Sequence, residues 1–142
     1  MEKSAFNWPV RVYYEDTDAG GVVYHSNYLN FMERARTEML RSLGFDQDVL
    51  YRELKVLFVV RSLQLDYLRP ARFNEQLFVT TRVENMARVS LDFQQMIYRE
   101  PVPGETSQLL VRAAIKVACI DAGRFKPVAI PPVIQEALYG DY

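Results

Sequence analysis

One stretch of this chain has the spacing of an amphipathic helix, whereas most of the chain after it has the pattern of β-strands. From Asn27 onward the apolar residues recur at Tyr28, Phe31/Met32, Ala35, Met39 and Leu43. Such spacing places them on one helix face, which must be buried against another element. Ser26 or Asn27 can cap the start, and Gly44 suits a left-handed stop. We predict one helix of about four to five turns.

The strand patterns predict a single antiparallel sheet for this helix to cover. Trp8, Val10, Val12 and Tyr14 alternate with other residues, which predicts a first strand from residue 8 to about 16. Further strands are expected at residues 58–67, 76–86, 89–99 and 108–120, all rich in β-branched and aromatic residues. Short turns join neighbouring runs, and a helical tail is expected at 133–138. The predicted class is α+β, with one long helix on a five-stranded sheet.

The composition is typical of one globular domain, which we expect to span residues 1–142. Seventeen basic and eighteen acidic residues give a net charge of −1, so no general attraction to nucleic acid is expected. No run approaches the roughly 20 apolar residues of a transmembrane segment, and the N-terminus lacks a secretory apolar core. We therefore expect a cytoplasmic protein. Cys119 is the only cysteine and is expected in the core.

The candidate site is the loop between the first strand and the helix. It gathers Asp16, Asp18, Gly20, Gly21 and His25, the only histidine, within ten positions. Buried polar groups each need a partner, so a purely structural segment seldom concentrates so many of them beside flexible glycines. We therefore treat this loop as a candidate active site.

This arrangement fits chemistry on a carbonyl group. A helix N-terminus favours an ionised carboxylate at Asp18, which could attack a carbonyl carbon or activate water. Free backbone N–H groups at residues 23–26 could donate to the resulting oxyanion. His25 could donate a proton or orient the carbonyl, and Tyr14 offers a hydroxyl from the adjacent strand.

Two other interpretations of the same residues remain open. Asp16 and Asp18 could cap a turn or the helix, with His25 and Tyr14 serving structure alone. Alternatively, Asp16, Asp18 and His25 could ligate a divalent metal ion. We do not favour a metal, because the chain has no second histidine.

The sequences YYEDTDAGGVVYHSNY at 13–28, FMERAR at 31–36 and LDYLRPARF at 65–73 closely resemble one known family. This family is the Tol-Pal-associated acyl-CoA thioesterases, the YbgC-like branch of the 4-hydroxybenzoyl-CoA thioesterase superfamily. The resemblance covers about the first 120 residues. It implies a hotdog fold, in which a curled antiparallel sheet wraps the long helix. It also implies a homodimer paired edge to edge, often assembled into a homotetramer, with active sites at the dimer interface.

The resemblance also implies roles for individual residues. The family's catalytic aspartate, histidine and tyrosine correspond to Asp18, His25 and Tyr14, and the backbone N–H groups of Tyr24 and His25 match the position that polarises the thioester carbonyl. Whether the aspartate is a nucleophile or a general base stays open, and we favour the base. For coenzyme A, which is part of the substrate, Arg88 matches a basic position that meets the nucleotide in relatives. The chain also offers Arg61, beside Ser62, for the phosphates. No metal or separate cofactor is implied.

The function expected from this resemblance is hydrolysis of an acyl-CoA thioester to a carboxylic acid and free coenzyme A. One alternative is a hydratase or dehydratase, because other hotdog enzymes pair a histidine with a carboxylate to move water on an acyl thioester. Another is a non-catalytic acyl-binding scaffold that interacts with acyl carrier protein. The acyl chain length is not readable from the sequence.

Overall fold

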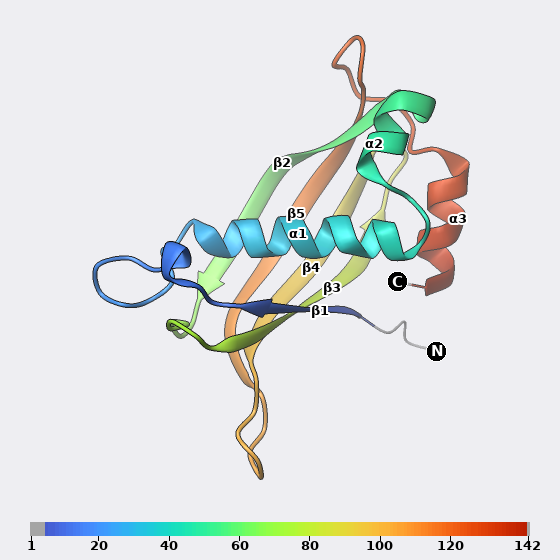
Figure 1. The fold of residues 1–142 in the computed structure, drawn as a ribbon. Helices are drawn as coiled ribbons and strands as arrows, with labels where there is room; N and C mark the ends of the chain where they lie inside the picture. The colour runs from blue at the N-terminus through green and yellow to red at the C-terminus, as the bar shows by residue number, and fades with distance from the viewer. Residues whose placement is uncertain (1–4, 142) are drawn as a thin grey trace.

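A computed structural model describes residues 5–141, and its core is a five-stranded antiparallel sheet crossed by one long helix (Figure 1). The strands are β1 (Phe6–Arg11), β2 (Val56–Tyr67), β3 (Gln76–Met86), β4 (Ser90–Arg99) and β5 (Gln108–Asp121). The helices are α1 (Asn27–Ser42), the short α2 (Gln47–Val49) and α3 (Pro132–Asp141). The strand order is β1-β3-β4-β5-β2, with every neighbouring pair antiparallel. The α+β prediction is confirmed.

Helix α1 buries the face that its apolar spacing indicates. Phe31, Met32, Ala35 and Met39 are fully buried, and Tyr28 is nearly so. Each large apolar side chain that leaves water in this way contributes about 1.5–3 kcal/mol to folding. The helix packs most closely on β1 and β3, so the β2 side of the sheet is less tightly covered.

The helix ends as predicted. Gly44 has a φ of +94°, a conformation that favours glycine. Its N–H donates to the Arg41 carbonyl (3.0 Å), and the Phe45 N–H donates to the Leu40 carbonyl (2.9 Å). These two bonds form a Schellman motif, which satisfies carbonyls that the end of a helix leaves unpaired. The chain then turns away from the helix axis toward α2.

The sheet has one buried face and one face turned away from α1. Side chains of β3 and β4 alternate between buried and partly exposed along most of their length. In contrast, β2 lies at an edge and is exposed over much of its second half. The other edge is the shorter β1. The two edges therefore differ, and β2 is the longer one without a neighbour in this chain.

The first strand is shorter than predicted. It ends at Arg11, and residues Tyr14–Asp16 form a short 3-10 helix instead. The Asp16 carboxylate accepts the Tyr13 N–H (2.9 Å), and the Asp16 N–H donates to the Tyr13 carbonyl (3.0 Å). These local bonds offer the backbone an alternative to a sheet ladder, which the alternating pattern could not reveal.

Other differences lie near the ends of elements. The apolar spacing predicted no helix at residues 47–54, where α2 leads into one π-helical turn, Leu50–Leu54. Strand β2 starts two residues before the predicted position. The expected helical tail is confirmed as α3, which buries Ile134 and Leu138. The predicted side-chain cap of α1 is wrong. Ser26 occupies the N-cap position without a side-chain hydrogen bond to the helix.

Cys119 lies in the core as predicted and is fully buried. Burial raises the pKa of its thiol to about 11, because the charged thiolate loses its hydration. Such a thiol is almost entirely protonated near neutral pH, so it is a poor nucleophile. Within residues 5–141, no helix has both the length and the apolar character needed to cross a bilayer.

Candidate active site

The loop before α1 folds as a miniature hairpin. Thr17 and Val23 form an isolated antiparallel bridge, and the Asp18 N–H donates to the Val22 carbonyl (2.9 Å). The loop is tied to the segment before β3, because the Val23 N–H donates to the Ala71 carbonyl (2.9 Å). Figure 1 shows this blue loop extending beyond the sheet at the N-terminal end of α1. A catalytic group on this loop is therefore presented outward, while the loop itself is anchored to the segment before β3.

Asp18 lies at the tip of this hairpin with an exposed carboxylate. One oxygen, Oδ1, accepts the Gly20 N–H (2.8 Å), whereas Oδ2 has no hydrogen-bond partner within residues 5–141. A Cβ at position 20 would lie only 3.2 Å from Oδ1, and Gly21 closes the turn with a φ of +78°. Gly21 is therefore favoured by the backbone of this turn, whereas a side chain at position 20 would crowd the Asp18 carboxylate. The turn holds one carboxylate oxygen and leaves the other free.

Asp16 has a different role from Asp18, because its carboxylate is buried and fully engaged. Oδ2 accepts the Tyr13 N–H (2.9 Å), and Oδ1 accepts the Asn27 side-chain amide (2.6 Å). The backbone carbonyl of Asp16 accepts the Tyr24 N–H (2.9 Å). Asp16 therefore joins both ends of the loop to the start of α1.

His25 precedes α1, and its side chain is exposed. Its imidazole lies against the Tyr24 ring, with 4.4 Å between the ring centroids, and its carbonyl accepts the Tyr67 hydroxyl (2.8 Å). Within residues 5–141 the N–H groups of His25 and Ser26 have no acceptor, whereas the Tyr24 N–H is occupied by Asp16. Of the two expected oxyanion donors, His25 is therefore the unoccupied one. Its N–H lies at the positive end of the α1 dipole.

Tyr14 does not lie on a strand, contrary to the prediction. It belongs to the 3-10 helix, and its ring stacks on Phe73 with 3.9 Å between the centroids. Tyr14 is 76% exposed and Phe73 40% in the single chain. Tyr24 and His25 form a separate ring pair on the same loop.

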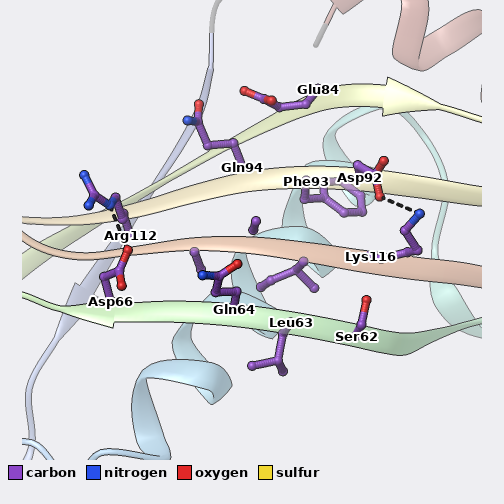
Figure 2. A pocket seen from close by; sticks show the side chains of 13 residues that line it. Ser62, Leu63, Gln64, Asp66, Glu84, Asp92, Phe93, Gln94, Arg112 and Lys116 are labelled. Atoms are coloured by element: carbon purple, nitrogen blue, oxygen red, sulfur yellow. Dashed lines mark hydrogen bonds and ion pairs between the residues drawn. The ribbon is translucent and has the colours of Figure 1, made fainter.

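The residues expected at coenzyme A lie apart from the loop within one chain. Arg61 occupies a β-bulge in the middle of β2. Arg88 follows β3, whose other end lies by the loop anchor, so the length of an 11-residue strand, roughly 36 Å, separates them. Figure 2 shows Ser62 on the wall of a hollow of about 550 Å³ on the sheet face away from α1. No single-chain site unites these three residues with Asp18.

Four of the five charged side chains that line the outer hollow are paired. Arg112 Nε donates to Asp66 (3.0 Å), and Lys116 Nζ lies 3.5 Å from an Asp92 oxygen (Figure 2). These pairs are partly exposed and contribute little to stability. Glu84 lines the hollow outside these two pairs, so the lining has one more acidic than basic side chain.

A second cavity, of about 460 Å³, lies between α1 and the β2 side of the sheet. Its walls include Arg36 and Leu40 from α1, Phe58 and Val59 from β2, and Leu91 and Phe93 from β4. The cavity opens where α1 leaves β2 less tightly covered. Its size and largely apolar lining are typical of a small-molecule pocket.

The metal interpretation gains no support from this geometry. Across residues 5–141, no group of three histidine, cysteine, aspartate or glutamate side chains is arranged to hold a metal ion. Asp16 directs both oxygens to protein donors, and Asp18 directs one to Gly20.

Comparison with known proteins identifies the family. Residues 12–138 match the thioesterase-like superfamily. The chain belongs to this superfamily. Acyl-CoA thioesterase YbgC of Haemophilus influenzae is 45% identical over 139 residues, or 98% of each chain. Acyl-CoA thioester hydrolase YbgC of Escherichia coli is 48% identical over 134 residues, covering 94% of this chain and 96% of that one.

A crystal structure of a probable thioesterase from Bartonella henselae has the same architecture as this thioesterase-like chain. Its sequence is 34% identical, its TM-score is 0.80, and the match covers 90% of this chain and all of the other. The predicted family resemblance is therefore confirmed. The curled five-stranded sheet around α1 is the hotdog fold, as expected.

Three contacts that support the loop were missed by sequence reasoning. Asn27 binds Asp16, Tyr67 binds the His25 carbonyl, and Tyr28 accepts the Ala71 N–H (3.0 Å). The last two join residues more than 40 positions apart, so no local spacing could reveal them. Burial raises the pKa of Tyr28, and the bond from Ala71 partly opposes that shift.

Proposed function

We propose that this member of the thioesterase-like superfamily is an acyl-CoA thioesterase, which hydrolyses an acyl-CoA to a carboxylic acid and free coenzyme A. The observation that carries this proposal is the half-free Asp18 carboxylate on a hairpin that leads directly to the uncapped start of α1. A base and an oxyanion donor on one anchored loop are the parts that acyl transfer to water needs. The YbgC thioesterases from the two bacteria support the same reaction.

The proposed mechanism uses Asp18 as a general base. Its free oxygen takes a proton from water as the water oxygen attacks the thioester carbon. The resulting oxyanion accepts the His25 backbone N–H at the positive end of the α1 dipole. The C–S bond then breaks, and the His25 imidazole supplies the proton to the leaving sulfur. Tyr14 borders the path of the thioester, with its ring held by Phe73.

We also propose a homodimer formed through β2. This edge strand has twelve residues, contains no proline or lysine, and exposes Val60, Leu63 and Tyr67 at close to half of their surface. A long open edge of this kind is a template for pairing with another strand, because its backbone N–H and C=O groups are unpaired. A twofold axis at its centre would pair two copies of β2 antiparallel. Such dimers can assemble further into the expected homotetramer.

Antiparallel pairing would complete the active site from two chains. The Tyr67–His25 bond fixes the catalytic loop at the C-terminal end of β2, whereas the 460 Å³ cavity lies by Phe58–Val60 near its N-terminal end. Pairing two β2 strands antiparallel brings the C-terminal end of one beside the N-terminal end of the other. One subunit would then supply Asp18 and His25, and its partner the acyl cavity.

The same pairing would bring coenzyme A near Arg61 and Ser62 at the centre of β2, and near Arg88 of the partner. Arginine pairs well with phosphate, which supports this assignment. We expect Arg88→Ala to raise KM for acyl-CoA with little change in kcat.

We propose the cytoplasm as the compartment of this protein, and its association with the Tol-Pal system also stays a proposal. Acyl carrier protein is proposed as a second carrier of the acyl thioester. Comparing acyl carrier protein thioesters with acyl-CoAs tests this last proposal.

The central experiment measures thiol release from a panel of acyl-CoAs. Asp18→Asn retains an oxygen that can accept the Gly20 N–H, so the loop should fold while turnover falls by a factor of ~10² or more. His25→Ala should lower turnover by a similar factor. A folded Asp18→Asn protein with the parent's rate would exclude the role given to Asp18. Hydration of an enoyl thioester without thiol release would favour a hydratase, and binding without turnover an acyl-binding scaffold.

Subunit mixing tests the composite site. Thr37→Trp fills the cavity from α1, and Asp18→Asn removes the base, so each homodimer should be inactive. An equal mixture forms roughly one-half heterodimers, each with one intact site, so about one-quarter of the parent activity should return. No recovery after proven subunit exchange would place both parts of the site in one chain. Leu63→Lys should give monomers by light scattering and abolish activity with them.

A further inference from the structure

Arg36 is a partly buried cation with no anionic partner. It projects from α1 into the wall of the 460 Å³ cavity, and within residues 5–141 no carboxylate oxygen lies within 4.0 Å of its guanidinium. One of its nitrogens, Nη1, donates to the Gln95 side-chain oxygen (2.8 Å). The remaining N–H groups have no acceptor in that part of the chain and are not sealed inside protein. A cation left so incompletely satisfied has donors available for a ligand.

A buried network holds this guanidinium in place. Gln95 is fully buried, and its Nε2 donates both to the Met32 carbonyl (3.0 Å) and to Thr81 Oγ1 (2.8 Å). With its amide nitrogen fixed by these two acceptors, Gln95 must direct its oxygen at Arg36. Side chains that bind ligands are commonly held by supporting bonds of this kind. The network therefore fixes where the free donors of Arg36 point.

Apart from Glu33, Thr37 and Gln47, the residues that line the cavity with Arg36 are apolar. Phe58, Leu91, Phe93 and Val117 line it with apolar surface. Burial lowers the pKa of Arg36, and the nearby Glu33 carboxylate partly offsets that effect. A hydrogen bond to a charged donor gains strength in such surroundings. An occupant with an oxygen opposite Arg36 would thus be favoured over a purely hydrocarbon one.

We propose that Arg36 is a specificity residue that recognises a hydrogen-bond-accepting oxygen at the far end of the acyl group. This inference rests on the proposed thioesterase function and on the composite site, in which the partner subunit presents the thioester to this cavity. The thioester carbon would react at the partner's loop while the distal acyl atoms reach Arg36. The preferred substrates would be acyl-CoAs with an oxygenated end rather than simple alkyl chains.

Glu33 indicates that the acyl oxygen recognised by Arg36 is neutral rather than a carboxylate. It lies one helical turn before Arg36 and lines the same cavity, with an exposed carboxylate. A second carboxylate brought to this place would be repelled by Glu33. A hydroxyl group instead accepts from Arg36 and can donate to Glu33. We therefore expect hydroxyacyl groups to be preferred over dicarboxylic monothioesters.

The test compares CoA thioesters that differ only at the distal carbon. Hexanoyl-CoA and octanoyl-CoA are paired with their ω-hydroxy forms, and adipoyl-CoA supplies the carboxylate. In the parent protein, kcat/KM should be higher for at least one hydroxy form than for its alkyl match. Arg36→Met should reduce that ratio by a factor of ~10–10². Arg34→Met, on an exposed part of α1, should leave the ratio unchanged.

Two further measurements keep the inference falsifiable if Arg36→Met does not fold. If the parent protein hydrolyses both hexanoyl-CoA and octanoyl-CoA faster than their ω-hydroxy forms, the inference is overturned directly. Glu33→Gln should raise adipoyl-CoA turnover relative to hexanoyl-CoA, and no such rise overturns the choice of a neutral oxygen. If no thioester is hydrolysed, the proposed function fails. Arg36 is then judged by whether titration calorimetry shows tighter binding of 6-hydroxyhexanoyl-CoA than of hexanoyl-CoA.

Discussion

Replacing Asp16 and Asp18 in turn by asparagine should separate the positioning carboxylate from the reacting one. The chemical change is the same at both positions, and the residues lie two positions apart. Asp16 is buried and accepts two hydrogen bonds from protein donors, whereas Asp18 is exposed and accepts one. Asp16→Asn should therefore lower stability, while Asp18→Asn should lower only turnover.

The magnitude for Asp16→Asn follows from its two donors. An asparagine side chain has one acceptor oxygen, so its amide group must face either the Tyr13 N–H or the Asn27 amide. Losing one hydrogen bond to a charged, buried group costs about 1.5–3 kcal/mol of unfolding free energy. For a domain of this size, that corresponds to a fall in Tm of roughly 5–12 °C. At Asp18 the amide oxygen can still accept the Gly20 N–H, so the change should stay within about 0.5 kcal/mol.

The assay is urea unfolding followed by circular dichroism, with all proteins at one concentration because the stability of the proposed dimer would depend on concentration. Thiol release is measured on the same preparations. We expect a lower urea midpoint for Asp16→Asn, with residual thiol release that depends on the fraction of folded protein and on how far the loop keeps its shape. If Asp16→Asn unfolds at the midpoint of Asp18→Asn and of the parent, the two bonds to Asp16 do not hold the loop, and this reasoning is refuted.

Three further predictions concern Gly21, Tyr28 and Cys119. Gly21→Ala should cost about 1–2 kcal/mol because of its positive φ, whereas Gly140→Ala in α3 should be neutral or stabilising, as urea midpoints would show. Tyr28→Phe leaves the buried Ala71 N–H unpaired and should cost about 1–3 kcal/mol, against no loss for exposed Tyr51→Phe. The pKa of Cys119 is raised to about 11 from an ordinary 9.0. The contribution of its neutral thiol to the free energy of unfolding is therefore complete below pH 9 and is lost as pH rises toward 11. A neutral thiol reagent should label Cys119 at the unfolding rate, and rapid labelling of folded protein at pH 8 would contradict its burial.

Local sequence patterns were sufficient for the main elements. The spacing of Tyr28, Met32 and Met39 predicted the buried face of α1, and Gly44 predicted its end. Two-residue alternation predicted β3 with its observed bounds, and β4 and β5 to within one residue at each end. These signals are local because the 3.6 and 2.0 residue periods bring nearby side chains to one face. The first strand was the exception, since it ends at Arg11 and the Asp16 carboxylate accepts the Tyr13 N–H beside a 3-10 helix.

The sequence by itself determined the parts of the candidate site. It placed Asp18, Gly20, Gly21 and His25 on one loop before a helix, and its motif identified the superfamily. The resemblance matched the catalytic aspartate to Asp18, and only the tertiary structure supplied a physical reason for the difference between the two aspartates. Asp16 is buried and engaged whereas Asp18 has a free oxygen, and burial depends on residues distant in sequence.

The tertiary structure alone also showed what holds the loop and which sheet edge lies open beside the cavity. Tyr67 and Ala71 reach it across more than 40 residues, and the unpaired edge of β2 lies beside the cavity that contains Arg36. Contacts of this kind have no period in the sequence, because they depend on how separate elements pack. The sequence therefore determined which groups could react, and the packing of α1 against the sheet decided which of them are free to do so.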